Sequence, residues 1–320
     1  MARVVGRFAP TPSGYLHLGN LFCSLIAWLA AKSQGGDIIL RNEDLDRERT
    51  RQEYVLQARR DLDALGLFWD QGGEEGGPHA PYDQSQRFAF YRAQLAQLEA
   101  RGLCYPCFCS RAQLHAASAP HASDGELLYS GACRDLTPAQ VAEKSRTRSP
   151  ALRLRVPEET IAFTDLHYGP QAQHLPTGCG DFILRRSDGV YAYQLAVVVD
   201  DALMGITEIV RGCDLLSSTP QQLYLYQLLG FTPPAFIHVP LLMAADGRRL
   251  SKRDRDLDLG FLRQHFASPQ PLIGLLAFLA GLLPAPEPVS AKELLPLFSW
   301  QKVPHNNIIV SEKLLNLFKL

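Results

Sequence analysis

A histidine and a glycine lie where a strand is expected to pass into a helix. His17-Leu-Gly-Asn20 follows the short apolar run 3–9, and apolar residues at helical spacing follow it over 21–29. The first turn of a helix offers unpaired N–H groups and a partial positive charge, which suits a phosphate group. A histidine there can stabilise a phosphoryl transition state, and a glycine permits close approach to the backbone. This segment therefore predicts an ATP site, although the motif alone is a weak signal because loop histidines are more often surface residues.

A second segment, Arg249-Leu-Ser-Lys-Arg253, follows the turn Ala245-Asp-Gly247. A basic Ser-Lys loop can close over a triphosphate, and Lys252 would then neutralise charge in the transition state. Alone, such a run is more often a solvated charged surface. Its occurrence together with the histidine motif, in this order along one chain, favours the ATP site.

Three charged residues are expected at the ends of predicted strands. Arg7 closes the first strand, Glu43 follows the second, and Arg211 follows Glu208-Ile-Val. The carboxyl ends of strands in a doubly wound sheet converge on one ligand crevice. Arginine can bind a carboxylate through two hydrogen bonds, and a carboxylate can bind an ammonium group. The pattern suits an acidic amino acid, whereas each residue alone could form an ordinary surface salt bridge.

The cysteines indicate a metal site. Cys107 and Cys109 precede Cys133, and the chain has seven cysteines, an odd number that argues against a disulfide framework. Structural zinc needs four ligands, so three thiolates require one more, and free buried thiols are the alternative. The chemical candidates for the fourth ligand are Cys104, His115 and His121.

Hydrophobic periodicity places these residues on an α/β fold. The predicted strands and helices alternate in the order strand, helix, strand, helix from the N-terminus, which is typical of a parallel nucleotide-binding sheet. We expect two halves of one Rossmann-type domain, a zinc-binding insertion between them that is largely irregular, and a helical C-terminal region. The predicted strands are 3–9, 37–41, 208–211 and 236–241, with regular structure also at 181–186 and 191–199, and the predicted helices are 21–35, 47–65, 88–100 and 220–229. The 71–78 stretch is expected to be a loop, and the predicted domain limits are 1–102, 103–179, 180–260 and 261–320.

Composition limits the class of protein. Hydrophobic residues make up 46% and charged residues 20% of the 320 residues, which is typical of a globular protein with a buried core. The formal net charge of −1 argues against a general polyanion binder, so any RNA contact needs a local basic patch. The N-terminus has no signal-peptide pattern, and the apolar stretch 272–283 is too short to span a bilayer. We expect a cytoplasmic protein, without membrane contact and monomeric.

The two motifs resemble those of the class I aminoacyl-tRNA synthetases. His17-Leu-Gly-Asn20 resembles the "HIGH" motif and Arg249-Leu-Ser-Lys-Arg253 resembles the "KMSKS" loop, while Arg7-Phe-Ala-Pro-Thr-Pro-Ser-Gly-Tyr-Leu-His-Leu-Gly looks like the opening of the glutamyl/glutaminyl subgroup. Asn20 stands where the family often has His, and Arg249 and Arg253 replace Lys and Ser. The resemblance implies a class I catalytic domain with His17 and Lys252 as catalytic residues. It implies ATP contacts from His17, Gly19, Asn20, Ser251 and Lys252, with Mg²⁺ accompanying the ATP.

The same resemblance implies a glutamate site. Carboxylate contacts would come from Arg7, Phe8, Ala9, Pro10, Thr11 and Arg211. Glu43 would contact the ammonium group, and Tyr193 would line the pocket. Val197 stands where the full-length synthetases tend to have Asn, which implies weaker glutamate binding.

The zinc pattern and the length resemble the glutamyl-Q tRNA(Asp) synthetase family. Cys-x-Cys followed by Tyr-x₃-Cys implies one structural Zn²⁺ held by Cys107, Cys109, Tyr129 and Cys133, and Cys23, Cys179 and Cys213 are not expected to be ligands. Too few residues follow Arg253 for an anticodon-binding module. The resemblance implies tRNA-independent activation of L-glutamate by ATP and its transfer to queuosine in the anticodon loop of tRNA(Asp).

Other functions stay open at this point. One is an ordinary glutamyl-tRNA synthetase core, another a catalytically inactive binding paralogue that acts as a regulator. A nucleotidyltransferase with a related histidine motif suits the fold but explains neither Glu43 nor Arg211.

Overall fold

A parallel sheet lies at the centre of the fold, and its first three strands come from the N-terminal part of the chain. The computed structural model describes residues 3–110, 128–248 and 268–311. Strands β1 (Val5–Phe8), β2 (Asp37–Leu40) and β3 (Gln71–Gly72) pair in parallel in that order. The short strand β3 lies inside the stretch expected to be a loop. Gly72 has φ +90° and a Cβ atom there would collide with the Leu40 carbonyl oxygen, so this close pairing requires glycine.

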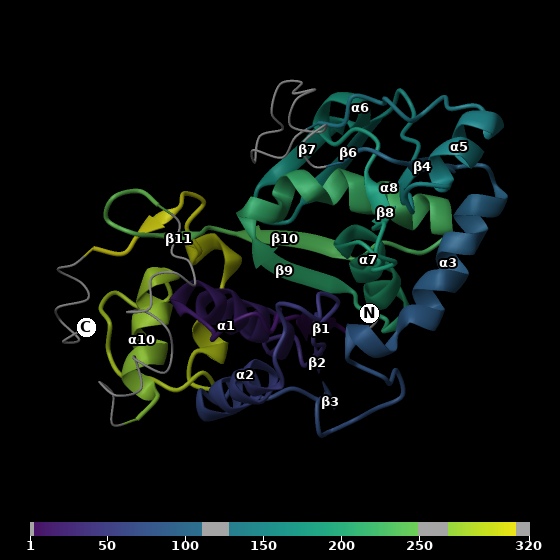
Figure 1. Cartoon of the computed structure of the whole chain (residues 1–320). Helices are drawn as coiled ribbons and strands as arrows, with labels where there is room; N and C mark the ends of the chain where they lie inside the picture. The colour runs from purple at the N-terminus through teal and green to yellow at the C-terminus, as the bar shows by residue number, and fades with distance from the viewer. Residues whose placement is uncertain (1–2, 111–127, 249–267, 312–320) are drawn as a thin grey trace.

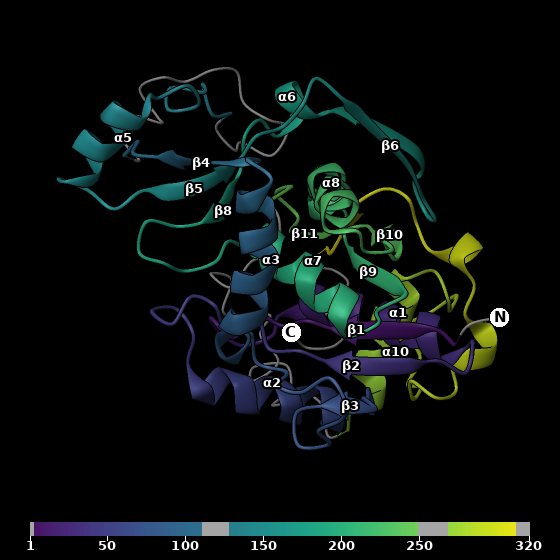
Figure 2. The same cartoon turned by 90° about the vertical axis from the view of Figure 1, so that its right-hand side faces the viewer.

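The second half of the sheet comes from much later in the chain. Strands β9 (Glu208–Gly212) and β10 (Ala235–Val239) pair in parallel. The amide of Thr207, directly before β9, donates to the Val5 carbonyl at 2.9 Å, so β9 lies beside β1. Figure 2 shows β9, β1, β2 and β3 side by side. This arrangement confirms the predicted α/β class and the split of the sheet between two parts of the chain.

Helices cover both faces of the sheet. On one face α1 (Leu18–Lys32) packs against α10 (Gln270–Leu279), and their apolar side chains form one hydrophobic cluster with the inner strands. On the other face α3 (Phe88–Ala100), α7 (Tyr193–Leu203) and α8 (Thr219–Leu229) enclose a second cluster. Figure 1 shows these layers around the sheet. The apolar residues of α1 recur at the helical spacing read from the sequence because that face is buried here.

The segment between the two halves is more regular than expected. Strands β4 (Cys104–Cys107), β5 (Ala151–Leu154) and β8 (Ile183–Arg185) form an antiparallel sheet. Strands β6 (Thr160–Asp165) and β7 (Gly169–His174) form a hairpin. The expectation of an irregular region was wrong here, because several residues of these short strands face solvent and the apolar alternation is weak.

Smaller elements complete the described part of the chain. Helix α2 (Gln52–Ala64) begins later than the predicted 47, because residues just before it form turns. Near the C-terminus, β12 (Ile308–Ile309) pairs with β11 (Leu242–Met243), so this region contains a strand in addition to helix. The remaining short helices are α5 (Pro138–Ser145), α6 (Leu175–Gly178), η1 (Gln84–Gln86), η2 (Cys213–Ser218), η4 (Leu295–Leu297) and η5 (Trp300–Lys302). Among the described residues, no helix combines the length and apolarity that a bilayer crossing requires.

Candidate active site

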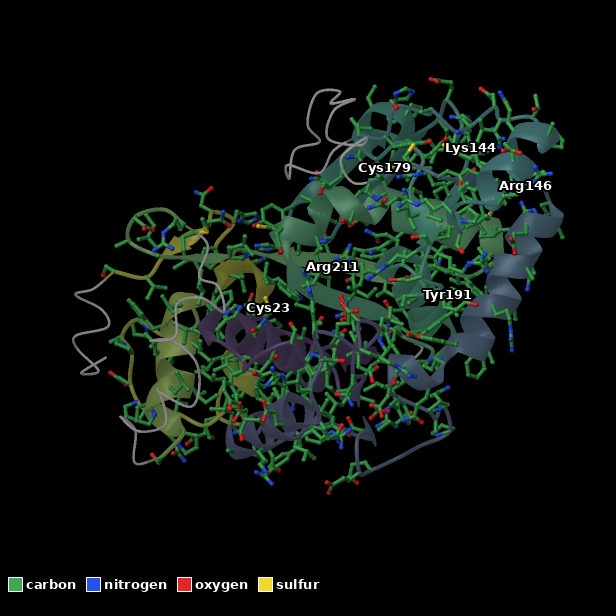
Figure 3. All side chains as sticks on the ribbon, in the orientation of Figure 1. Cys23, Lys144, Arg146, Cys179, Tyr191 and Arg211 are labelled. Carbon is green, nitrogen blue, oxygen red and sulfur yellow. The ribbon has the colours of Figure 1, made fainter. Side chains whose placement is uncertain are left out.

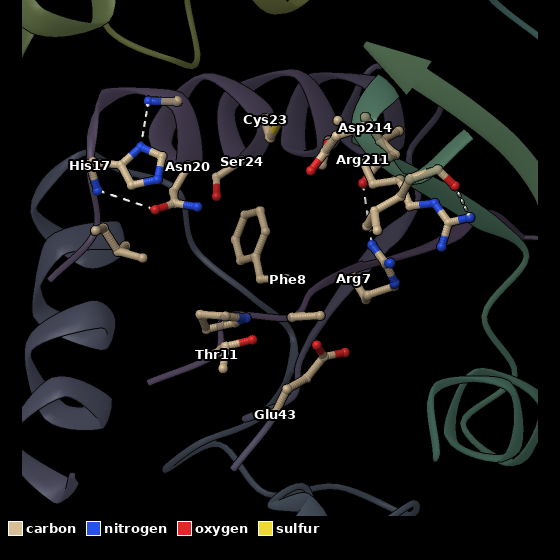
Figure 4. Close-up of a pocket in the computed structure, with 18 of the residues that line it drawn as sticks. Arg7, Phe8, Thr11, His17, Asn20, Cys23, Ser24, Glu43, Arg211 and Asp214 are labelled. Carbon is tan, nitrogen blue, oxygen red and sulfur yellow. Dashed lines mark hydrogen bonds between the residues drawn. The ribbon is translucent and has the colours of Figure 1, made fainter. Parts of the chain in front are cut away.

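A cavity of about 660 Å³ opens at the carboxyl ends of β1 and β9, beside the first turn of α1 (Figure 4). Every predicted ATP and glutamate residue that the structure describes lines it. These are Arg7, Phe8, Ala9, Pro10, Thr11, His17, Gly19, Asn20, Glu43, Tyr193 and Arg211. Ser251 and Lys252 lie outside the described residues. The cavity is also lined by Cys23, Ser24 and Asp214, which no motif in the sequence indicated.

His17 is the N-cap of α1 at one end of the cavity. Its Nδ1 accepts a hydrogen bond from the Gly19 amide at 3.1 Å, and the Asn20 side chain accepts from the His17 amide at 3.2 Å. A neutral imidazole that accepts at Nδ1 carries its proton on Nε2. A Cβ atom on Gly19 would lie 3.1 Å from the His17 ring, so glycine lets the imidazole pack this closely. This end of the cavity therefore places an imidazole at the positive end of the α1 helix dipole, a combination that suits phosphate.

Arg211 lies near the opposite end and is only 5% exposed. Its guanidinium donates to His238 Nε2 at 2.9 Å, Gln222 Oε1 at 2.8 Å and Thr219 Oγ1 at 2.8 Å. It also donates to the Leu215 carbonyl at 3.2 Å. All four acceptors are neutral groups, and burial lowers the pKa of Arg211. A buried cation held by neutral acceptors is well placed to bind an anionic ligand.

A chain of buried charges lies below the cavity. Arg41, with no exposed side-chain surface, donates to Asp201 at 2.6 Å and to Glu43 at 3.1 Å. Arg7 lies 3.6 Å from the same Asp201 carboxylate and donates to the Val210 carbonyl at 3.2 Å. Burial alone would lower the pKa of Arg41, but the surrounding carboxylates hold it well above its usual value. These buried ion pairs hold Arg7 and Glu43 on the same wall of the cavity.

Glu43 and Tyr193 lie close to each other on that wall. Burial raises the pKa of Glu43, although Arg41 and Arg7 oppose this effect. Burial, with the nearby Glu43 charge, raises the pKa of Tyr193 to about 12, so its hydroxyl stays protonated at neutral pH. Unlike the charged residues that were expected at strand ends, Tyr193 begins helix α7. Its side chain nevertheless lines the same cavity.

Several supporting residues were missed from the sequence. Asp200 accepts from Arg87 Nε at 2.6 Å and from the Tyr91 hydroxyl at 2.8 Å, while Asp201 joins Arg7 and Arg41. The sequence did contain a signal for them, because Asp200 and Asp201 directly follow the apolar run 195–199 and buried carboxylates need cationic partners. Val197, expected to affect glutamate binding, lies in the apolar core at 1% exposure.

A second constellation lies in the insertion. The sulfurs of Cys107, Cys109 and Cys133 lie within 4.8 Å of one another, and this group could hold a metal ion. The Tyr129 hydroxyl lies 3.5 Å from Cys107 Sγ and 3.8 Å from Cys109 Sγ. Cys104, a chemical candidate for the fourth ligand, packs against the second hydrophobic cluster instead, and burial raises its pKa to about 12. The two histidine candidates, His115 and His121, lie outside the described residues.

Known proteins share both the fold and the sequence pattern of this site. The profile of the family described as "tRNA synthetases class I (E and Q), catalytic domain" matches residues 3–315. The "Crystal Structure of Glutamate-tRNA Synthetase from Elizabethkingia anophelis" superimposes with a TM-score of 0.85 at 28% identity, and the match covers 99% of this chain and 70% of that chain. The fold and the cavity therefore define a class I tRNA synthetase catalytic domain of the E and Q group.

Two curated relatives match over almost their whole lengths. A "Glutamyl-Q tRNA(Asp) synthetase" from Symbiobacterium thermophilum is 53% identical, with 95% of this chain and 94% of that protein covered. A protein of the same name from Nitratidesulfovibrio vulgaris is 46% identical, with 98% of each covered. The chain therefore belongs to the glutamyl-Q tRNA(Asp) synthetase family and is a ligase.

Proposed function

We propose that this enzyme activates L-glutamate with ATP, without tRNA, and transfers the glutamyl group to queuosine in the anticodon loop of tRNA(Asp). The observation that carries the activation step is the cavity itself. His17 and the first turn of α1 lie at one end of it, and the buried Arg211 lies at the other. The names of the two full-length relatives support the queuosine acceptor.

Each end of the cavity has a distinct part in the activation step. Arg211 and the Arg7–Thr11 segment bind glutamate carboxylate, and Glu43 binds the ammonium group. An oxygen of the α-carboxylate then attacks the α-phosphorus of ATP, the bond to the bridging oxygen breaks, and pyrophosphate leaves. His17 donates from Nε2 to the phosphoryl oxygens, and Lys252 neutralises the triphosphate, which enters with Mg²⁺. Positioning and charge stabilisation suffice for this step, so no nucleophilic side chain is required.

The transfer step uses the mixed anhydride as an acyl donor. A hydroxyl of the queuosine cyclopentene ring attacks the glutamyl carbonyl, and a new ester bond forms. AMP leaves with the electron pair of the broken anhydride bond, and the hydroxyl proton passes to the departing phosphate or to solvent. An ordinary glutamyl-tRNA synthetase would use a hydroxyl of the terminal ribose in the same way. The two functions therefore differ in the acceptor and share the activation step.

Glutamate-dependent exchange of labelled pyrophosphate into ATP tests the activation step. We expect exchange in the absence of any tRNA, and none when glutamine replaces glutamate, because Arg211 requires a carboxylate. Exchange that needs added tRNA would contradict tRNA-independent activation. No exchange under either condition would favour the inactive binding paralogue.

We expect the His17→Asn variant to lose about 10²-fold in kcat of the exchange reaction, the cost of one transition-state donor. Asparagine can still accept from the Gly19 amide as an N-cap, so the helix should remain stable. The KM for glutamate should change little because His17 lies away from Arg211. His174 is a half-buried histidine at the end of β7, and His174→Asn is the matched control that should keep full activity. An unchanged kcat in His17→Asn would remove this histidine from the catalytic step.

The cysteine cluster fits a structural Zn²⁺. Tetrahedral zinc with Zn–S bonds of about 2.3 Å separates its sulfur ligands by about 3.8 Å. Cys109 Sγ and Cys133 Sγ lie 3.6 Å apart, and the Tyr129 oxygen lies 3.5 Å from Cys107 Sγ and 3.8 Å from Cys109 Sγ. The Tyr129 oxygen also accepts from the Cys133 amide at 2.7 Å, which would favour a phenolate ligand. The bound ion would join the strand β4 side of the insertion to the 129–133 loop.

We expect Cys133→Ser to lose stoichiometric zinc, measured by elemental analysis of the purified protein. Loss of a ligand from a structural site should also lower the stability of the insertion, which limited proteolysis would detect. Cys179→Ser, a half-buried cysteine whose sulfur donates to the Leu175 carbonyl, is the control and should keep its zinc. Equal zinc content in both variants would contradict this ligand set.

A further inference from the structure

The Arg211 guanidinium rests against a histidine that a carboxylate in turn holds. Arg211 Nε donates to His238 Nε2 at 2.9 Å, and His238 Nδ1 lies 2.7 Å from Asp165 Oδ2. All three side chains are at most 5% exposed. Neither Asp165 nor His238 lines the cavity, whereas Arg211, which donates to His238, does.

The hydrogen bonds fix the tautomer of His238. An ionised carboxylate only accepts hydrogen bonds, so the proton of a neutral His238 must lie on Nδ1. Nε2 then presents a lone pair to the Arg211 Nε–H group. The opposite tautomer would set two N–H groups against each other at this contact. Burial lowers the pKa of His238, which keeps the ring neutral, although the hydrogen bond with Asp165 opposes this.

Asp165 is itself held in place by backbone amides. Its carboxylate accepts from the amides of His167 at 3.0 Å, Tyr168 at 2.7 Å and His238 at 3.1 Å. Burial disfavours its charge, but these hydrogen bonds and that of the His238 ring lower the pKa of Asp165. Asp165 ends strand β6, so the β6–β7 hairpin of the insertion is linked to Arg211 through Asp165 and His238.

The imidazole also separates the carboxylate from the guanidinium. A carboxylate in direct contact would neutralise Arg211 and weaken its attraction for a ligand carboxylate. A neutral ring supplies the same acceptor without a charge. The remaining contacts of Arg211 come from Gln222, Thr219 and a backbone carbonyl, which are also neutral. The arrangement therefore fixes the direction of the guanidinium and leaves its charge available.

We propose that Asp165 and His238 are positioning residues for glutamate recognition, which orient Arg211 by setting the His238 tautomer. The proposal rests on the proposed function, because it assumes that Arg211 binds a glutamate carboxylate. It adds two residues from outside the cavity, one of them in the insertion.

The test is the Asp165→Asn variant in glutamate-dependent pyrophosphate exchange. Asparagine has the size of aspartate and can still accept from the backbone amides. Its NH₂ group can donate to Nδ1, which permits the tautomer that opposes Arg211. We expect the KM for glutamate to rise about 10- to 100-fold, the loss that follows when one partner of a buried contact is misplaced. The kcat and the KM for ATP should stay within about threefold of wild type.

A double-mutant cycle separates positioning from a general packing effect. If Asp165 acts through His238, Asp165→Asn should have no further effect on the glutamate KM in a His238→Phe background. The proposal would be overturned if the effects of Asp165→Asn and His238→Phe on the glutamate KM multiplied in the double variant. It would also be overturned if Asp165→Asn raised the KM for ATP as much as that for glutamate, or left the glutamate KM within twofold of wild type. If His238→Phe does not fold, the KM values of Asp165→Asn alone decide.

Failure of the proposed function would be visible separately. Wild-type enzyme without glutamate-dependent exchange would contradict the proposed function. Wild-type exchange together with an unaffected Asp165→Asn variant would contradict only the positioning pair.

Discussion

We expect Arg211→Gln to lower kcat/KM for glutamate in pyrophosphate exchange by about 10³-fold, which corresponds to about 4 kcal/mol. The guanidinium is buried, and its described acceptors are neutral, so the ligand supplies its counter-charge. Without this cation, the glutamate carboxylate would be desolvated with Arg7 as the only arginine left among the described residues of the cavity wall. Most of the loss should appear in the KM for glutamate. The variant should also lose discrimination between glutamate and glutamine.

Arg146→Gln is the matched control for this substitution. Arg146 lies close to helix α5, away from the cavity, and pairs with Glu143 at 2.8 Å in an exposed contact (Figure 3). Exposed pairs of this kind contribute little, so we expect wild-type kinetics. Arg211→Gln with a glutamate KM within threefold of wild type would contradict the assignment of this arginine to the substrate carboxylate.

The second large effect is expected on stability. We expect Arg41→Met to lower the free energy of unfolding by about 3–5 kcal/mol, because the buried carboxylates of Glu43 and Asp201 lose the cation that hydrogen-bonds to both and keep only the more distant Arg7, 3.6 Å from Asp201. Arg41 is fully buried and donates to Asp201 and Glu43. Glu43 would then be more easily protonated, so glutamate binding should weaken as well. Urea unfolding measures the change, as a shift of the midpoint at constant slope.

Arg3→Met is the control for this prediction. Arg3 pairs with Asp37 at 2.6 Å, the same separation as between Arg41 and Asp201, but its side chain is 67% exposed. Its loss should cost about 1 kcal/mol or less. If Arg41→Met and Arg3→Met lowered the free energy of unfolding by similar amounts, burial of the Arg41 ion pairs would not be what makes them stabilising.

Elements with a strong period and a buried face could be predicted from the sequence. Helix α3 spans the predicted 88–100 because it buries one face against the core. Helix α1 contains its predicted apolar stripe and buries most of its surface, including all of residues 25–31. The antiparallel strands of the insertion could not be predicted, since the exposed positions of β6 and β7 obscure the alternation. Helix α2 was predicted to begin at residue 47 but begins at Gln52, because charged residues such as those of the 47–51 stretch occur in turns as well as in helices.

The candidate site was predictable where residue type and local position carry the signal. The predicted strand ends indicated that Arg7, Glu43 and Arg211 lie near one another, and all three line the same cavity. The residues that hold them were not predictable in the same way. His238 and Asp165 lie 73 residues apart in sequence, and Arg41 and Asp201 lie 160 apart. Such long-range partners leave no periodic pattern, and only an acid or a histidine within an apolar run indicates that a partner exists.

The acceptor is the central claim, and one measurement tests it most directly. Radiolabelled glutamate is offered with tRNA(Asp) that carries or lacks queuosine, each with and without its 3′-terminal adenosine. We predict labelling that depends on queuosine and persists when the terminal adenosine is removed. Labelling that is lost with the terminal adenosine, and that is indifferent to queuosine, would contradict the proposed function.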